Sequence, residues 1–176
     1  MRHSIIVLFS LALFGCPKSE PDKTQPTATA PSATTEAPKP SAVVSAAPVD
    51  ASKPAIDFKI SASASTMKFD VERFYATAGQ PVHVIFENKK PGTLPHNWVL
   101  VKPGKEASFA AFVVDKADAG YWAESPDALA HTDLVNPGDK TEITFNAPTE
   151  PGDYPYICSF PGHYMMMKGV LVVKAP

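Results

Sequence analysis

The segment Cys158-Ser159-Phe160-Pro161-Gly162-His163-Tyr164-Met165-Met166-Met167 places three kinds of metal-binding side chain within ten residues. Cys158 offers a thiol, His163 an imidazole and Met167 a thioether, and a Pro-Gly turn lies between the first two. Such a turn can bring the imidazole beside the sulfur without moving the strands that flank it. A second imidazole, that of His96, lies about sixty residues upstream, where it opens another apolar run.

Two imidazole nitrogens, one thiolate sulfur and a weak axial thioether form the ligand set of a blue-copper electron-transfer centre. Zinc is the alternative metal, but its structural sites take four firm N or S donors and its catalytic sites keep a position for water. Methionine is a poor zinc ligand and a common axial ligand of copper. We therefore predict one copper ion per chain, with Met165 and Met166 as competitors of Met167 for the axial position.

Short segments of residues 56–176 alternate between apolar and polar side chains, and Pro, Gly and Asn separate them, which is typical of strands. The expected strands are 58–61, 67–75, 81–87, 96–101, 141–145, 154–159 and 168–173. The pattern breaks between 103 and 136, with partial helical spacing over 106–114 and a helix start for 127–130 at Ser125-Pro126-Asp127. We predict an all-β fold, a Greek-key β-sandwich of antiparallel strands with a short helical flap.

Residues 1–15 have the features of an export signal. Arg2 supplies a basic start, and the apolar run 5–14 is too short to span a bilayer as a resident helix. The run closes on Leu13-Phe14-Gly15-Cys16, which resembles the lipobox of bacterial lipoproteins. By that resemblance, Cys16 would become the first mature residue and carry a lipid that anchors the chain to a membrane. The alternative is an ordinary cleaved signal peptide with a chance cysteine.

Residues 16–55 form a linker of different composition. Of the 39 residues 17–55, 8 are Pro, 9 are Ala, 10 are Ser or Thr and none is aromatic. Such a segment cannot bury enough apolar surface to offset its ordering entropy, so we expect a disordered tether. Its four Lys balance its four Asp and Glu, so a charged binding arm is not expected.

The head, residues 56–176, has the size of one domain, and its composition excludes several functions. It carries 11 Lys and Arg against 14 Asp and Glu, a net charge of −3, without a basic patch, which argues against nucleic acid binding. It has no His-x-His motif, which a multicopper oxidase needs for its second copper cluster, so we do not expect an enzyme. Cys158 is its only cysteine, and a lone thiol in an oxidising compartment needs burial or a metal.

The stretch His96-Asn97-Trp98-Val99-Leu100 and the stretch 156–169 resemble the two signature segments of the azurin and auracyanin branch of the cupredoxins. Ala130-His131-Thr132 and the following Pro137-Gly138-Asp139 also resemble that branch. The resemblance covers essentially the whole head and none of the linker. It implies a cupredoxin (blue copper) fold and a type 1 copper centre, with these ligands: His96, Cys158 and His163 in the trigonal plane, and Met167 on the axis.

The same resemblance assigns roles to residues around the metal. Asn97 and Ser159 would hydrogen-bond to each other and lock the two ligand segments together. The backbone N–H groups of Asn97 and Phe160 would point at the Cys158 sulfur, and outer-shell bonds of this kind tune a centre's potential. The family position that matches His131 is solvent-exposed and not a ligand.

An apolar patch is expected around the outer edge of His163, formed by Phe160, Pro161, Tyr164, Met165 and Met166. We expect His163 to be the ligand nearest solvent, so electrons would pass through this patch to redox partners, such as a cytochrome or a membrane redox complex. We predict a monomeric, membrane-tethered one-electron carrier on the periplasmic face of the cell envelope, lipid-anchored to the inner or outer membrane. The alternative is a periplasmic copper-binding protein for copper delivery or storage, which the three consecutive methionines favour.

Overall fold

The computed structural model of the chain describes residues 49 and 53–176. The predicted export signal, the predicted lipid-bearing Cys16 and most of the predicted linker lie outside the described residues. In the part of the chain that is described, no helix is both long enough and apolar enough to cross a bilayer.

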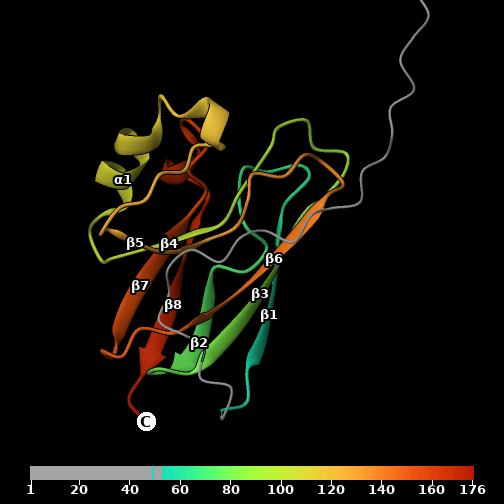
Figure 1. Cartoon of the computed structure of the whole chain (residues 1–176). Helices are drawn as coiled ribbons and strands as arrows, with labels where there is room; N and C mark the ends of the chain where they lie inside the picture. Colours follow the sequence, from blue (N-terminus) through green and yellow to red (C-terminus); the bar gives the residue numbers. More distant parts are fainter. Residues whose placement is uncertain (1–48, 50–52) are drawn as a thin grey trace, which may run out of the picture. The chain divides into compact units, whose positions relative to one another are not determined.

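Two β-sheets pack face to face (Figure 1). The smaller sheet has three strands in the order β1-β3-β6, and the larger has five in the order β2-β8-β7-β4-β5. The strands are β1 (Ile56–Ala62), β2 (Arg73–Thr77), β3 (Pro81–Asn88), β4 (Val99–Val101), β5 (Ala128–His131), β6 (Lys140–Asn146), β7 (Gly152–Ile157) and β8 (Lys168–Lys174). The helices of the described chain are α1 (Glu106–Val113) and two 3-10 turns, η1 (Ala117–Ala119) and η2 (His163–Met165).

The chain crosses repeatedly between the sheets, so the all-β Greek-key sandwich predicted from the sequence is confirmed. Two pairs of strands nevertheless run parallel, β1 with β3 and β2 with β8, where we expected antiparallel neighbours. The chain between β1 and β3 passes through β2 of the other sheet, so no hairpin joins the two neighbours. Of the predicted strand 67–75, only the end from Arg73 belongs to β2, and Phe69 makes an isolated bridge with Ala62.

Aromatic rings from both sheets fill the space between them. Phe58 of β1 stacks on Phe74 of β2 with ring centroids 3.6 Å apart, and the ring of Tyr156 on β7 contacts both. Trp98 is fully buried against Tyr156, at a centroid distance of 5.7 Å. The apolar positions of β3 that alternate with polar ones are also fully buried here: Val82, Val84 and Phe86. The alternation in the sequence therefore identified the inner face of the sandwich correctly.

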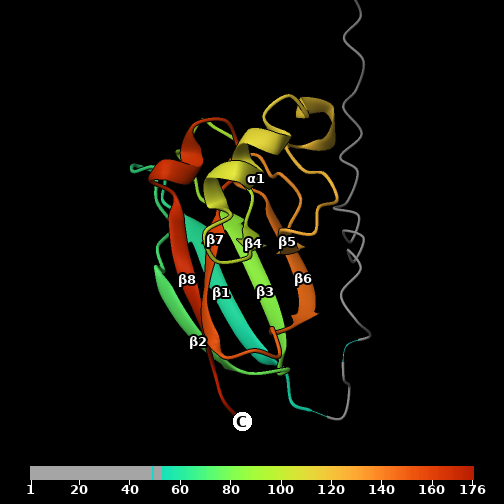
Figure 2. The same cartoon turned by 90° about the vertical axis from the view of Figure 1, so that its left-hand side faces the viewer.

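A second apolar cluster lies on the outer face of the larger sheet, beneath α1. Figure 2 shows α1 in front of β4 and β7. The cluster joins residues of the helix to residues of these strands: Phe109, Ala110 and Val113 with Val99, Val101 and Ile157. The predicted helical flap therefore covers the sheet beside the segments that carry His96 and Cys158.

The helix predicted for 127–130 is wrong. A turn does start there, because the Ser125 hydroxyl accepts a hydrogen bond from the Asp127 N–H (3.2 Å) and the Ser125 carbonyl accepts one from the Ala128 N–H (3.2 Å). The turn does not continue, because residues 128–131 form β5, which pairs antiparallel with β4 at the edge of the larger sheet. Pairing with a neighbouring strand outweighed the local helix signal.

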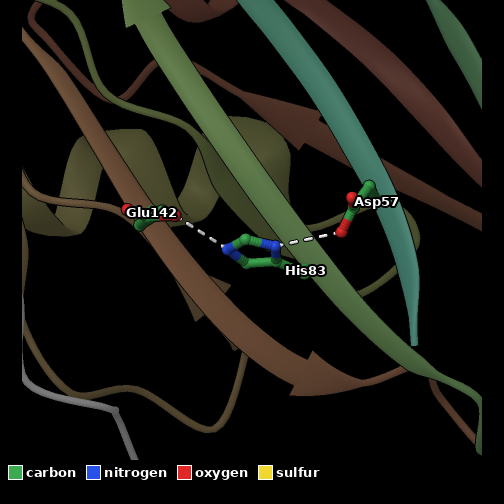
Figure 3. A network of polar contacts seen from close by, with 3 residues as sticks. All are labelled: Asp57, His83 and Glu142. Carbon is green, nitrogen blue, oxygen red and sulfur yellow. Dashed lines mark hydrogen bonds and ion pairs between the residues drawn. The ribbon is translucent and has the colours of Figure 1, made fainter. Parts of the chain in front are cut away.

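His83 links the three strands of the smaller sheet on its outer face (Figure 3). Its Nδ1 lies 3.1 Å from a carboxylate oxygen of Asp57 on β1, and its Nε2 lies 2.9 Å from one of Glu142 on β6. The two ring nitrogens point in opposite directions, so the three side chains cross-link strands and do not converge on one metal ion.

Gly169 of β8 makes room for the buried ring of Tyr156, its cross-strand partner. A Cβ at position 169 would overlap the Tyr156 ring, which cannot move away because its hydroxyl donates to the Val71 carbonyl (2.6 Å). We expect Gly169→Ala to lower the free energy of unfolding by about 2 kcal/mol. Urea denaturation followed by tryptophan fluorescence measures this change.

The matched control is Gly152→Ala on the neighbouring strand. A Cβ there would lie 3.7 Å from the nearest atom of the Tyr154 ring, an ordinary contact. We expect the control to change the free energy of unfolding by less than about 0.5 kcal/mol. Equal losses in the two variants would contradict the packing argument.

Candidate metal centre

The pairing of β7 with β8 fixes Cys158. This residue follows directly after β7, and its N–H donates to the carbonyl of Met167 (3.0 Å), just before β8 begins. The antiparallel pair Ile157 and Lys168 closes the loop at its base. The Cys158 side chain is fully buried at this strand end, and it is a free thiol.

A left-handed glycine turns the chain so that His163 faces Cys158. Gly162 has a φ of 81°, a conformation that glycine adopts without steric cost. The N–H of His163 then donates to the Phe160 carbonyl (3.0 Å), and the His163 carbonyl accepts a hydrogen bond from the Met167 N–H (2.8 Å). The ligand loop, residues 158–167, is thus held by its own backbone hydrogen bonds.

His96 comes from the connection between β3 and β4. Its N–H and its carbonyl both hydrogen-bond Val135, at 3.1 and 2.9 Å. The buried side-chain amide of Asn88 donates to the carbonyls of Leu94 and Val135, at 2.9 Å each. The backbone around His96 is therefore held by hydrogen bonds within the protein, independently of a metal ion.

The donor atoms of these three residues converge on one point. The Cys158 Sγ lies 3.7 Å from Nδ1 of His96 and 3.6 Å from Nδ1 of His163, and the two nitrogens are 3.2 Å apart. A triangle with these sides has its equidistant point about 2.0 Å from each corner, which matches a transition-metal bond to imidazole and is about 0.3 Å shorter than one to thiolate sulfur. The three residues therefore fit around a single ion of this size.

Burial sets the protonation of the three groups. It raises the pKa of the Cys158 thiol to about 11, although hydrogen bonds from the backbone N–H groups of Asn97 and Phe160 lower it in part. Burial lowers the pKa of His96 to about 4, with a further contribution from His163, and it also lowers the pKa of His163. Both imidazoles are consequently neutral at pH 7, the form that binds a metal, and an ion that binds here displaces the thiol proton.

Asn97 and Ser159 connect the two ligand segments through reciprocal hydrogen bonds. The Ser159 N–H donates to Asn97 Oδ1 (2.9 Å), and Asn97 Nδ2 donates to the Ser159 hydroxyl oxygen (2.8 Å). Both side chains are buried. The neighbours of His96 and Cys158 are therefore tied directly to each other.

Exposure separates the three consecutive methionines. Met167 is fully buried and packs in the same apolar cluster as Cys158. Met165 and Met166 are 61% and 56% exposed. Met167 is therefore the member of the run that lies inside the protein with the donor triangle.

Both candidate imidazoles are buried, with His163 3% and His96 7% exposed, so exposure does not single out either one as the ligand nearest to solvent. The ring of Phe160 packs against His163 at a centroid distance of 4.6 Å. Leu94 and His96 instead line a depression of about 160 Å³ beside the loop 63–67.

His131 is buried, where the family resemblance implied exposure. It ends β5, opposite Val99, and its ring stacks on Trp122 with centroids 3.5 Å apart. Its Nδ1 lies 3.1 Å from the carbonyl of Thr132. The flap closes over this edge strand, and for that reason the side chain is inside.

Sequence reasoning missed two carbonyls of the flap that hydrogen-bond the residues next to His96 and Cys158. The Gly120 carbonyl accepts from Asn97 Nδ2 (3.4 Å), and the Tyr121 carbonyl accepts from the Ser159 hydroxyl (2.7 Å). A backbone acceptor has no side-chain signature, so the sequence pattern could not point to these carbonyls.

Comparisons with known proteins agree with this geometry. A family model described as copper binding proteins, plastocyanin/azurin family, matches residues 56–174. Auracyanin-B of Chloroflexus aurantiacus is 35% identical over 154 residues, which cover 85% of this chain and 63%, less than two thirds, of that relative. Auracyanin-A of the same organism is 34% identical over 123 residues, 68% of this chain and 75% of the relative. Azurin of Pseudomonas aeruginosa is 36% identical over 96 residues, 48% of this chain and 63% of the azurin.

Solved structures extend the agreement to the fold. The structure of auracyanin A, described as a "blue" copper protein from a green thermophilic photosynthetic bacterium, has a TM-score of 0.63 at 36% identity and covers 69% of this chain and 100% of its own. The structure of auracyanin B has a TM-score of 0.64 at 35% identity and covers 67% of this chain and 88% of its own. On the family match, these relatives and the copper-compatible donor set, the chain belongs to the plastocyanin/azurin family of copper binding proteins.

Proposed function

We propose that the chain is a membrane-tethered one-electron carrier, with a type 1 copper centre held by His96, Cys158, His163 and Met167. The strongest support is that the Cys158 sulfur and the two imidazole nitrogens surround one point, about 2.0 Å from each of them, where a metal ion could bind. Copper is the metal of the family. When bound, it supplies a one-electron couple, Cu(I)/Cu(II), and the protein supplies the fixed ligands around it.

Rigid ligands suit this function. The donors sit at strand ends or on a loop with its own hydrogen bonds, and Asn97 and Ser159 tie the two ligand segments together. Little rearrangement between two oxidation states favours fast electron exchange. The N–H groups that hydrogen-bond the Cys158 sulfur would also tune the potential.

The buried thioether of Met167 would complete the set as a weak fourth ligand. Met166 is the alternative from the sequence, but more than half of its surface is exposed. A side chain at the surface is poorly placed to reach a centre whose other donors are all buried. Burial therefore favours Met167.

Electrons would leave through the apolar patch beside His163. Met165 is exposed, the ring of Phe160 packs on the His163 imidazole, and a groove of about 240 Å³ continues the patch toward α1. The groove lies between helix and ligand loop and is lined by Ala107, Ala110, Ala111, Val114 and residues 159–162 and 164. A small, shallow apolar surface suits a redox protein partner that binds briefly and dissociates quickly.

The chain is not an enzyme, since the family and the relatives are copper binding proteins, azurins and auracyanins. Copper delivery or storage is the second candidate, because Met165 and Met166 are both exposed and offer thioether sulfurs to copper. Such proteins release copper readily. The closed and buried donor set favours the electron carrier instead.

Copper binding gives the first test. The copper-loaded chain should show the intense blue absorption of thiolate-to-Cu(II) charge transfer, reversible electrochemistry and slow loss of copper to EDTA. Cys158→Ser should abolish the colour, because serine offers no thiolate. The other cysteine provides the control, since Cys16→Ser should leave the colour intact. A colourless wild-type protein would overturn the proposal, and rapid loss of copper to EDTA would favour delivery.

The patch gives the second test. Met165→Lys or Tyr164→Lys should slow electron self-exchange between reduced and oxidised copies by about tenfold, because two added charges repel when the patches meet. The visible spectrum should not change, since neither residue supplies a donor atom. Tyr75→Lys is the matched control: Tyr75 is 53% exposed on β2, where its ring contacts Lys174. An unchanged rate in both patch variants would exclude this route.

The tether extends the proposal to the rest of the chain. The lipobox-like Leu13-Phe14-Gly15-Cys16 and the Pro-, Ala-, Ser- and Thr-rich residues 16–55 support a lipid-anchored head on the periplasmic face of the envelope. The Pro-rich linker would let a monomeric head reach partners at a distance from the membrane.

Fractionation tests the anchor. The wild-type protein should sediment with membranes and enter detergent on phase separation, whereas Cys16→Ser should appear in the soluble periplasmic fraction. The blue colour of that variant confirms that its head is folded. Soluble wild-type protein, or a variant that stays with the membrane, would contradict lipid anchoring at Cys16.

A further inference from the structure

Tyr121 has an unusual backbone conformation. Among the described residues it is the only one other than glycine with a positive φ, at 56°. A bulky side chain rarely adopts this left-handed conformation, and it persists only where surrounding contacts enforce it. Gly120 precedes it with a φ of 65°, so the flap turns sharply here, and the Tyr121 N–H returns to the Lys116 carbonyl (2.9 Å).

The turn aims two successive carbonyls at the metal centre. The Tyr121 carbonyl accepts from the Ser159 hydroxyl (2.7 Å), and the Gly120 carbonyl accepts from Asn97 Nδ2 (3.4 Å). Ser159 and Asn97 are buried, so their donors depend on protein acceptors. The flap therefore completes the hydrogen bonding of the pair that ties the ligand segments together.

The ring of Tyr121 reaches the ligand loop as well. It meets the ring of Phe160 edge to face, with centroids 5.0 Å apart. Phe160 in turn packs on His163 at 4.6 Å, and its N–H hydrogen-bonds the Cys158 sulfur. Tyr121 thus contacts the two residues that follow Cys158, one through its carbonyl and one through its ring.

Attachment of the flap does not require this arrangement. The neighbouring Trp122 already fastens the flap, since its ring stacks on His131 at 3.5 Å and packs on Phe109 of α1 at 5.6 Å. Those contacts involve neither the carbonyl nor the ring of Tyr121. What the left-handed conformation adds is a carbonyl and a ring against the ligand loop.

We propose that Tyr121 is a positioning residue of the metal centre: its left-handed backbone braces Ser159 and Phe160, and so fixes the orientation of Cys158 and His163. This role rests on the proposed function, because it concerns the same copper site. It makes the flap part of the centre's support and not only a cover of the sheet.

Four chains test the proposal: the full-length wild type, Tyr121→Gly, Tyr121→Phe and Trp122→Leu. Tyr121→Gly keeps the left-handed backbone accessible but removes the ring and the rigidity of the turn. In the copper-loaded protein it should speed copper loss to EDTA about tenfold and change the visible and electron-spin-resonance spectra. Tyr121→Phe keeps ring and backbone and should restore both readouts to within about twofold of wild type.

Trp122→Leu is the matched control for a merely structural role. It should lower the thermal stability of the metal-free protein, because it removes the stack on His131. It should leave the spectra and the rate of copper loss unchanged. Wild-type behaviour of Tyr121→Gly, or equal effects of Tyr121→Gly and Trp122→Leu on the spectra, would overturn the proposal. If the glycine variant does not accumulate, Tyr121→Asn replaces it, because asparagine tolerates the left-handed region.

A metal-free measurement keeps this role separate from the proposed function. Hydrogen exchange at the Ser159 and Phe160 amides should become faster in metal-free Tyr121→Gly and remain slow in metal-free Trp122→Leu. A wild-type chain that took up no copper would overturn the proposed function, yet the amide exchange would still decide whether Tyr121 braces the loop. Unchanged exchange in Tyr121→Gly would exclude the brace.

Discussion

The reciprocal hydrogen bonds between Asn97 and Ser159 join two segments that are 62 residues apart in the chain. Each residue is next to a metal-binding side chain, His96 on one segment and Cys158 on the other. The strands that continue these segments, β4 and β7, pair antiparallel, so the link lies at the end of a regular ladder. The positions of His96 and Cys158 are thus set by the pairing of β4 with β7 and by the Asn97–Ser159 hydrogen bonds.

The centre is also buried, and its polar groups differ in the hydrogen-bond partners that they find there. The sulfur has two N–H donors, and the Asn97 amide and the Ser159 hydroxyl have partners on the flap. The imidazole nitrogens face the sulfur and each other at 3.2–3.7 Å. A metal ion is the partner that suits three buried donors at one point, since unpaired buried polar groups are costly. Metal binding at this site would therefore give the three buried donor atoms a partner that the protein alone does not supply.

Sequence alone predicted the two donors of the ligand loop that the structure brings together with His96, because they are close in the chain. Cys158 and His163 are five residues apart, and the Pro-Gly turn between them constrains their positions. His96 was harder, since its place depends on which strands are neighbours, and the two signature segments supplied that information. The period-2 pattern of β3 indicated the core face, whereas it contained nothing about the parallel pairing of β1 with β3.

The features that sequence missed depend on tertiary contacts. The four residues of β5 have a capped turn before them and become a strand only because β4 offers an edge. His131 looked exposed in its polar context, but Trp122 of the flap covers it. The left-handed Tyr121 follows a glycine, and no local pattern demands that conformation for a tyrosine. In each case, the outcome depended on a contact outside the local segment.

The position of β8 has a consequence for biosynthesis. This strand lies between β2 and β7 inside the larger sheet, although it is the last to be made, and Cys158 and His163 immediately precede it. β2 pairs only with β8 in the described sheet, so about a hundred residues must be synthesised after β2 before its partner strand is available. An emerging chain therefore has no finished donor set to offer until β8 has joined the sheet.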